Sequence, residues 1–548
     1  MPRNAVLALS IVIASLPGAA RASAQEHAQH ARLGRLGRVS FPVSCTAEAR
    51  RRFEQAMAGL HSFWWEEGDR AFGAVLAADS SCAMAQWGRA LNAWGNPFAG
   101  GPLGPSLALG VEAAAKASAK PLPTAREQGF VNAVAALYRN ASATSNAERL
   151  QAYADTLARL YREFPDDVEV TIYHALALVA TAPRTDTTFA QQKRAIALLN
   201  PLYDRYPDHP GLAHYIIHST DSPRLASLGL KAARRYTRIA PAAPHAQHMP
   251  SHIFVRLGLW DETVSANLQA FQVGMDHMRA TAAPGPSPEE LHVLDYAVYG
   301  YLQRGRDSAA KAAVARGESL GVVVSRNALV AEYNRTAMAA RVPLETGDWA
   351  SAASFPAPQG RDSGVSVVLR RFTRAIGAAR SGDAAAARVE VAGLDGMARS
   401  LARREEIYWA RIAAIKRDAA EAWRLFASGD SVAGLALAAA AADSEDVTDK
   451  HPVTPAELLP ARELQADMLL AAGRYAEALA AYRATLAREP GRARGYYGAG
   501  RAAQLSGNQE AATKAYGDYL KAMQGGDGKR PEISTARAFL EAKRATSS

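Results

Sequence analysis

Residues 459–490 read LPARELQADMLLAAGRYAEALAAYRATLAREP, and residues 493–520 read ARGYYGAGRAAQLSGNQEAATKAYGDYL. The second stretch repeats the first with a period of 34 residues, as three pairs of positions show: Gly473 and Gly507, Ala478 and Ala512, Tyr482 and Tyr516. A glycine turn between two helices, a small residue where they cross and an aromatic residue behind it account for this pattern. Because neither helix of such a unit can bury its apolar face alone, the units are expected to stack.

The same pattern returns along most of the chain. Glycine turns are expected at Gly258, Gly305, Gly347, Gly382 and Gly429, and unit-closing prolines at Pro165 and Pro207. The 34-residue unit resembles the tetratricopeptide repeat (TPR). No alternating run is long enough to suggest a sheet. The predicted fold is therefore all-α, a right-handed α-solenoid of helix-turn-helix repeats.

The chain divides into four expected parts. Residues 1–24 have a positive start (MPRN), an apolar core (AVLALSIVIASL) and an A-x-A cleavage site, and predict a secretory signal peptide. Residues 25–43 are polar and predict a flexible tail. Residues 44–330 are expected to form an N-terminal TPR-like array with a His-rich concave groove, and residues 331–548 a C-terminal array.

Export follows from the signal peptide, to a periplasm or the outside. The apolar run is too short for a stable membrane span, and no later segment is apolar enough, so no integral membrane span is expected. Retention of the signal as an N-terminal anchor is the alternative.

Composition and charge narrow the function classes. Of the 548 residues, 49% are hydrophobic and 21% charged, which indicates a globular protein. The formal net charge is +10, but Lys and Arg are scattered, so a solvated basic surface is favoured over nucleic-acid binding. The sequence lacks P-loop, G-x-G-x-x-G and H-E-x-x-H motifs, so it gives no support for those nucleotide-binding and metallohydrolase classes.

The chain has two cysteines, Cys45 and Cys82. In an oxidising compartment an isolated pair favours one disulfide. Two inert buried thiols are the alternative.

Histidines gather in one stretch. Five of the 13 lie between residues 214 and 252, and two pairs have the spacing H-x-x-x-H: His214 with His218, and His248 with His252. The second pair lies 34 residues after the first, so the pairs occupy equivalent places in consecutive repeats. Resemblance to the TPR family implies that these helices line the concave groove.

The repeat frame adds further polar residues to the same face. The expected metal ligands are His214, His218, Asp221, His245, His248 and His252. A ligand groove is expected to continue through His292, Asp295 and Tyr299. Three neighbouring repeats are thus predicted to contribute to one patch.

Imidazole suits Zn, Cu, Fe and Ni, and a mixed His and carboxylate set also suits Mn. Two histidines at i and i+4 can hold one ion from one helix, and an open position could activate water. Pro250 either kinks the second helix or begins it, which would change the geometry of that pair. The non-metal alternative is a polar groove that hydrogen-bonds a peptide or a small anionic ligand.

Other histidines are weaker candidates. His61 lies near Glu66 and Glu67 at the end of a first helix. His174 is expected in the core, and His451 in a loop before a proline.

Beyond the generic repeat, five segments resemble a group of exported bacterial TPR proteins: SCAMAQWGRALNAWGNPF, GLAHYIIHSTDSP, PHAQHMPSHIFVRLGLWDE, LHVLDYAVYGYLQRG and DKHPVTPAELLPARE. The resemblance implies the architecture and not an activity. Two hypotheses follow. One is a scaffold that binds a protein, peptide or small molecule in the His-rich groove through a divalent transition metal. The other is a metal-dependent hydrolase or oxidoreductase that uses the same patch.

Overall fold

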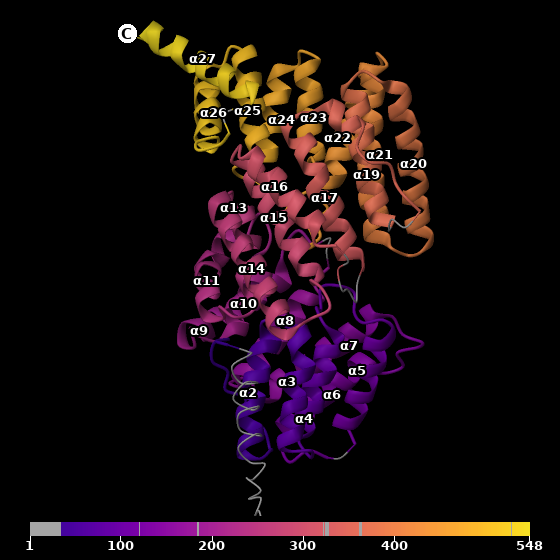
Figure 1. The fold of residues 1–548 in the computed structure, drawn as a ribbon, viewed down its shortest axis with the longest axis vertical. Helices are drawn as coiled ribbons and strands as arrows, with labels where there is room; N and C mark the ends of the chain where they lie inside the picture. Colours follow the sequence, from indigo (N-terminus) through magenta and orange to yellow (C-terminus); the bar gives the residue numbers. More distant parts are fainter. Residues whose placement is uncertain are drawn as a thin grey trace, which may run out of the picture.

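A computed structural model describes residues 34–119, 121–183, 186–321, 323, 328–360, 364–527 and 529–547. Every regular element in these ranges is a helix, and the helices pack in sequence order into an elongated all-α solenoid (Figure 1). The expected signal peptide (1–24) lies outside the described residues.

Helices from the first third of the chain form the indigo end of the molecule (Figure 1). They are α2 (Ala47–His61), α3 (Trp65–Ala78), α4 (Ala83–Trp94), α5 (Gly104–Ala117), α6 (Ala125–Tyr138), α7 (Asn146–Glu163) and α8 (Val168–Ala180). The middle of the molecule contains α9 (Ala190–Arg205), α10 (Pro210–Thr220), α11 (Ala226–Ile239), α12 (Pro244–His248), α13 (Pro250–Leu257), α14 (Trp260–Thr281), α15 (Pro288–Gln303), α16 (Asp307–Ser319) and α17 (Ala328–Thr346).

The C-terminal helices form the other end. They are α18 (Trp349–Ala353), α19 (Gly364–Arg380), α20 (Ala384–Arg403), α21 (Ile407–Ala427), α22 (Ser431–Asp446), α23 (Ala461–Ala471), α24 (Tyr475–Arg488), α25 (Ala493–Leu505), α26 (Gln509–Ala522) and α27 (Pro531–Ser547). Residue 331, where the C-terminal array was expected to begin, lies in the first turn of α17.

The two repeats that define the period are helix pairs. Gly473 joins α23 to α24 and Gly507 joins α25 to α26, and both have the positive φ that ends a helix most easily at glycine (+74° and +79°). The five earlier turn glycines also have positive φ: Gly258, Gly305, Gly347, Gly382 and Gly429. The predicted glycine turns between helices are therefore confirmed.

Close helix crossings explain the small and aromatic positions. Tyr482 is buried against Gly498 of the next helix, where an added Cβ would lie 2.2 Å from the tyrosine ring. Tyr516 contacts Gly500 in the same way. The tyrosine of one helix thus fills the space that a glycine on its neighbour leaves open.

The C-terminal repeats also pack back onto the middle of the molecule. Trp260 at the start of α14 donates its indole N–H to the carbonyl of Gly491 at 2.8 Å. Arg304, after α15, donates to the carbonyl of Ala522 at 2.8 Å. Segments more than 200 residues apart in the sequence therefore contact each other.

The expected flexible tail over residues 25–43 is wrong for residues 34–43. Leu36, Phe41 and Val43 are buried, and the Phe41 ring packs 5.3 Å from Phe53 and 5.1 Å from Phe130. Three apolar side chains in a short polar-looking segment are enough to fill a gap between α2 and α6.

The disulfide is confirmed. Cys45 precedes α2 and Cys82 caps α4, and their Cα atoms lie 5.3 Å apart in a bonded pair. The bond joins the segment before α2 to the start of α4 and so closes a loop that contains α2 and α3.

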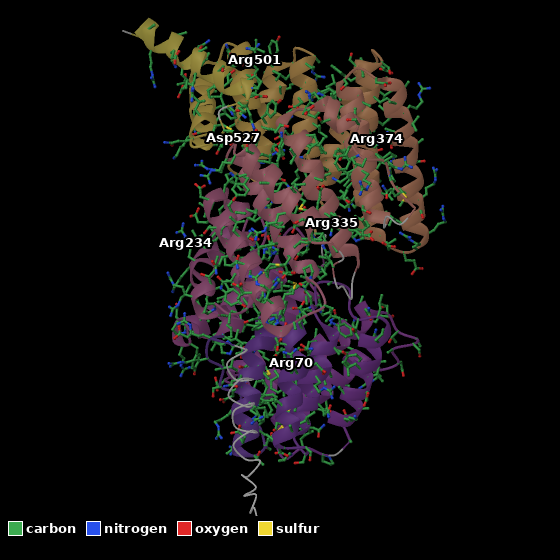
Figure 2. All side chains as sticks on the ribbon, in the orientation of Figure 1. Arg70, Arg234, Arg335, Arg374, Arg501 and Asp527 are labelled. Carbon is green, nitrogen blue, oxygen red and sulfur yellow. A yellow bond between two sulfur atoms is a disulfide. The ribbon has the colours of Figure 1, made fainter. Side chains whose placement is uncertain are left out.

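None of the helices among the described residues is long and apolar enough to cross a bilayer. Charged side chains lie over all parts of the molecule, as six labelled residues from separate helices and turns illustrate (Figure 2): Arg70, Arg234, Arg335, Arg374, Arg501 and Asp527.

Replacing Phe41 by alanine tests the packing of the N-terminal segment. Truncation of a buried phenylalanine costs about 3–5 kcal/mol. We therefore expect Phe41→Ala to lower the free energy of unfolding of the N-terminal helices by about this amount, measured as a lower denaturant midpoint. Ser40→Ala, which changes the exposed neighbour, should leave it unchanged. Equal midpoints for the two variants would mean that the segment does not contribute to the core.

Candidate metal centre

Six histidines from three successive parts of the array form one continuous chain of rings in the middle of the molecule. His214 and His218 lie on α10, His245 and His248 on α12, His252 on α13 and His292 on α15. Neighbouring rings are in contact along the whole row: His214 and His245 are 5.1 Å apart between centroids, His245 and His248 6.0 Å, and His248 and His292 4.5 Å. We call these six residues the histidine chain.

The first triad consists of His214, His218 and His245, and a nitrogen of each lies within 4.8 Å of the other two. The Nε2 atoms of His214 and His218 are 3.1 Å apart. Phe63 packs on all three rings, and Phe98 stacks on His218 at 4.4 Å. The aromatic cover holds these imidazoles in place on one side.

The second triad consists of His248, His252 and His292, again with nitrogens within 4.8 Å of one another. The Nε2 atoms of His248 and His252 are 3.0 Å apart. All three side chains are buried. Each i,i+4 pair of the sequence therefore gains its third histidine from the next part of the array, and the two pairs do not meet at one point.

Hydrogen bonds on the far nitrogen fix the protonation of the second triad. Nδ1 of His252 faces a carboxylate oxygen of Asp221 at 2.9 Å, and Nδ1 of His292 faces the carbonyl of Val453 at 3.1 Å. Nδ1 of His248 faces Oδ1 of Asn267 at 2.6 Å, while the amide nitrogen of Asn267 donates to a backbone carbonyl. These oxygens can only accept, so each Nδ1 carries the proton and each Nε2 carries a lone pair.

Two members of the first triad are fixed in the same way. His214 donates from Nδ1 to the carbonyl of His61 at 2.6 Å, and His245 donates from Nδ1 to Glu289 at 3.0 Å. Nε2 of His245 is buried and has no hydrogen-bond partner. A metal-binding histidine usually has its other nitrogen hydrogen-bonded to a protein oxygen, as five of these six do.

Pro250 does not disturb the second pair. A new helix, α13, begins at Pro250, but Met249 before it keeps helical dihedrals (φ −51°, ψ −36°). The chain therefore follows a helical path through the junction, and His248 and His252 remain on one face. The i,i+4 geometry survives because Pro250 stands at the first position of a helix, where its missing N–H costs little.

Asp221, expected to be a metal ligand, belongs to neither triad. Its carboxylate accepts from Nδ1 of His252 and so orients that ring. Its carboxylate also accepts from Arg256 at 2.8 Å and lies 3.8 Å from the ammonium of Lys450. Burial alone would raise the pKa of Asp221, but Lys450 and Arg256 hold it well below its usual range. Asp221 is therefore a charged acceptor that His252 meets at any moderate pH.

Asp295 and Tyr299, expected to line a ligand groove, are fully buried in protein contacts. The carboxylate of Asp295 pairs with Arg341 at 2.7 Å, and the hydroxyl of Tyr299 accepts from Arg492 at 3.0 Å. These arginines come from α17 and the start of α25, which sequence spacing cannot place. His292 differs from the other two, because it belongs to the second triad.

The expected open concave groove is covered at the second triad. Residues 447–460, between α22 and α23, lie over α15, and we call them the closing segment. Its Val453 carbonyl meets His292, and Tyr296 donates toward the carbonyl of Thr454 at 3.1 Å. Arg256 reaches Asp449 of the same segment at 3.0 Å. The closing segment thus forms a wall of the site.

The two triads differ in access. His218 and His245 of the first triad are partly exposed, with 17% of the His245 side chain accessible. The second triad is sealed. Burial lowers the pKa of His252 to about 4 and holds the pKa of His248 well below its usual range, so both rings are neutral at physiological pH.

Sequence reasoning missed several partners of the site. Asn267 and Glu289 hold His248 and His245, yet no motif links them to the histidines. A third group of potential ligands, His61 with Glu169 and His209, lies beside the first triad. His209 ends the stretch YPDH only five residues before His214, which is the one sequence signal that could have suggested it. His174, as expected, is a buried residue that stacks on Tyr161.

No protein-family model matches this chain, and no curated protein sequence matches it. Among solved structures, yeast Tom70 is similar over 90% of this chain and 89% of its own, with 10% identity and a TM-score of 0.29. A human IFIT1 dimer with m7Gppp-AAAA is similar over 93% of this chain and 95% of its own, with 11% identity and a TM-score of 0.30. At these scores the similarity carries no argument about function, and the fold rests on the helix pairs described above.

Acid should destabilise the metal-free protein. The pKa of His252 falls from 6.5 to about 4 because burial disfavours the imidazolium. Between these values the unfolded chain binds a proton that the folded chain does not, so the free energy of unfolding decreases as the pH falls through this window and is restored above it. We expect Tm, measured with a chelator present, to fall from pH 6.5 to 4.

His252→Gln should reduce the decrease in Tm between pH 6.5 and 4, because it removes the buried imidazole. His277→Gln, outside the histidine chain, should leave the part of the decrease that comes from His252 unchanged. If the two variants kept the same pH dependence, the buried neutral state of His252 would be contradicted.

Proposed function

We propose that this protein is an exported helical-repeat scaffold that binds divalent transition-metal ions on its histidine chain and presents them to a ligand or partner. The observation that carries the proposal is the pair of Nε2 atoms of His248 and His252, which face each other at 3.0 Å with a lone pair on each. Each neutral ring has one N–H, and in both rings it is on Nδ1. Neither Nε2 can therefore donate a hydrogen bond to the other.

Only a cation can occupy that position favourably. A proton would make one ring an imidazolium, which burial disfavours, whereas a metal ion accepts both lone pairs and leaves the rings neutral. Two nitrogens that each lie about 2.0–2.1 Å from one ion are separated by about 3–3.4 Å, depending on the angle at the metal. The spacings of 3.0 Å in the second triad and 3.1 Å in the first agree with such a shared ligand position.

The ligand set favours particular ions. Three neutral imidazoles suit Zn, Cu, Ni or Fe, and they suit Mn, Mg and Ca less well. Asp221 behind His252 and Glu289 behind His245 would offset part of the charge of a bound dication and raise the basicity of their rings.

The triads support different roles. The second triad, sealed by the closing segment, fits an ion that is retained. At the first triad, the partial exposure of His218 and His245 would leave a coordination position within reach of a protein, peptide or small-molecule ligand.

The same exposure favours the second candidate function, a metal-dependent enzyme. Three histidines and one open position form the arrangement that generates a metal-bound hydroxide in catalytic zinc sites. Because both candidates leave a coordination position open, turnover separates them: the Zn²⁺-loaded enzyme would hydrolyse an activated ester, and the scaffold would not.

Export belongs to this proposal. The disulfide between Cys45 and Cys82 is consistent with an oxidising compartment, periplasmic or outside the cell. Cleavage after Ala24 would make Gln25 the first residue of the mature protein, which N-terminal sequencing of exported material would detect.

Metal analysis of protein purified without a His-tag tests the central claim. We expect stoichiometric Zn, Cu, Ni or Fe, with one equivalent lost in the double variant His248→Asn/His252→Asn because two of three ligands are removed. His174→Asn is the matched control, since His174 is equally buried but belongs to none of the candidate metal groups.

Unchanged metal content and unchanged affinity for added Zn²⁺ in the double variant, with its helical circular dichroism intact, would refute a metal site at the second triad.

A further inference from the structure

A second kind of ligand group lies beside the histidine chain. His61 ends α2, Glu169 lies in the first turn of α8, and His209 caps the start of α10. The two oxygens of Glu169 are shared between the rings: Oε2 is 3.0 Å from Nε2 of His61, and Oε1 is 2.9 Å from Nε2 of His209. We call these three residues the mixed cluster.

Among the described residues, the carboxylate of the mixed cluster has imidazoles and no permanently charged side chain as its ion-pair partners. The Glu169 side chain is 1% exposed. Two other deeply buried carboxylates differ: Asp295 pairs with Arg341 at 2.7 Å, and Glu463 with Arg492 at 2.7 Å.

An isolated buried carboxylate is very costly, so such groups are paired with a cation or coordinate a metal. Burial lowers the pKa of the His61 imidazole, and the two histidines hold the pKa of Glu169 well below its usual range. In the metal-free protein each Nε2 donates to Glu169, and a bound metal ion would displace these protons. The cluster therefore offers two imidazole nitrogens and one anionic oxygen donor.

We propose that His61, Glu169 and His209 form a separate site for a divalent metal ion of the Fe²⁺, Mn²⁺ or Zn²⁺ class. Two histidines and one carboxylate are the ligand set that suits these ions, and this set differs from the all-imidazole triads because it contains an oxygen anion. The ion would place a permanent positive charge beside Glu169.

The surrounding backbone leaves room for this arrangement. At Gly211, an added Cβ would lie 2.6 Å from Nδ1 of His61, so the ring occupies space that only glycine leaves free. Nδ1 of His61 is held by the hydroxyl of Tyr215 at 3.1 Å, which fixes the plane of the ring with Nε2 toward Glu169.

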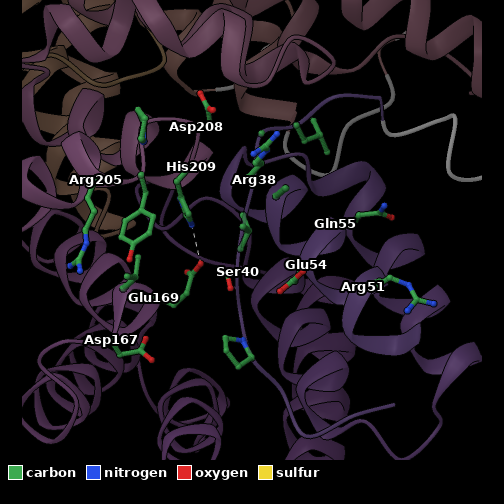
Figure 3. Close-up of a pocket in the computed structure, with 18 of the residues that line it drawn as sticks. Arg38, Ser40, Arg51, Glu54, Gln55, Asp167, Glu169, Arg205, Asp208 and His209 are labelled. Atoms are coloured by element: carbon green, nitrogen blue, oxygen red, sulfur yellow. Dashed lines mark hydrogen bonds and ion pairs between the residues drawn. The ribbon is translucent and has the colours of Figure 1, made fainter. Parts of the chain in front are cut away.

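A large cavity gives access to the mixed cluster. Its volume is about 1030 Å³, and Glu169 and His209 line it together with the N-terminal segment around Arg38 and Ser40 (Figure 3). Coordination positions that the three side chains leave open are therefore close to a space in which a ligand of the metal could bind. None of the residues that line this cavity belongs to the histidine chain.

Mn²⁺ alone is the probe that separates the mixed cluster from the histidine chain, because Mn²⁺ prefers sites with carboxylate oxygens over all-imidazole sites. Titration of the metal-free full chain with Mn²⁺, followed by loss of the free-ion EPR signal, should show one bound equivalent. We expect His248→Asn/His252→Asn to retain it and Glu169→Gln to weaken binding by at least about tenfold, since the charge is removed while the side-chain shape is kept.

The controls keep the result interpretable. His61 is left unchanged, because its carbonyl also holds His214. His209→Gln is the second variant at the mixed cluster and should also weaken Mn²⁺ binding, whereas His174→Asn should not. Circular dichroism shows whether each variant is folded.

Equal Mn²⁺ binding by wild type, Glu169→Gln and His209→Gln would overturn the inference, and so would loss of Mn²⁺ from the His248→Asn/His252→Asn variant alone. Neither result would affect the proposed function of the histidine chain, which depends on Zn²⁺ or Cu²⁺ binding at the triads.

Discussion

Hydrogen bonds from imidazole nitrogens to protein oxygens organise the centre of this protein. The solenoid brings α10, α12, α13 and α15 side by side because no helix pair can cover its own apolar face. Six imidazoles then lie in the interior, where each Nδ1 that faces a carbonyl or carboxylate is protonated and each matching Nε2 is not. Stacking against aromatic rings positions the imidazoles, and hydrogen bonds from the imidazoles to Asp221, Asn267 and Val453 set which nitrogen of each ring is protonated.

Much of the architecture follows from the sequence because its signals are local and periodic. A 34-residue period predicts the helix pairs and their glycine turns, and it places His214 and His248 in equivalent helices. The histidine pairs at i and i+4 follow from helix geometry alone. Even the junction at Pro250 is a local matter, settled by the dihedrals of Met249.

What the sequence could not predict depends on contacts between distant segments. The third member of each triad is set by how neighbouring helices cross, and the acceptor for His292 comes from Val453, 161 positions further along the chain. No sequence signal shows whether Asp295 and Tyr299 contact a ligand or a buried arginine. The packed N-terminal segment was missed because three apolar residues among polar ones are too weak a pattern to predict burial.

The closing segment and the helices of the middle of the molecule build the second triad together, although they are far apart in the sequence. Its carbonyl at Val453 orients an imidazole on α15, so any ion that binds His292 best in this orientation also favours the docked position of residues 447–460. The coupling is reciprocal. Docking of the closing segment raises the affinity for the ion by the same free energy by which the bound ion stabilises the docked segment. An occupied site would thus join the middle of the solenoid to its C-terminal helices as a non-covalent crosslink, placed far from the disulfide that fastens the other end.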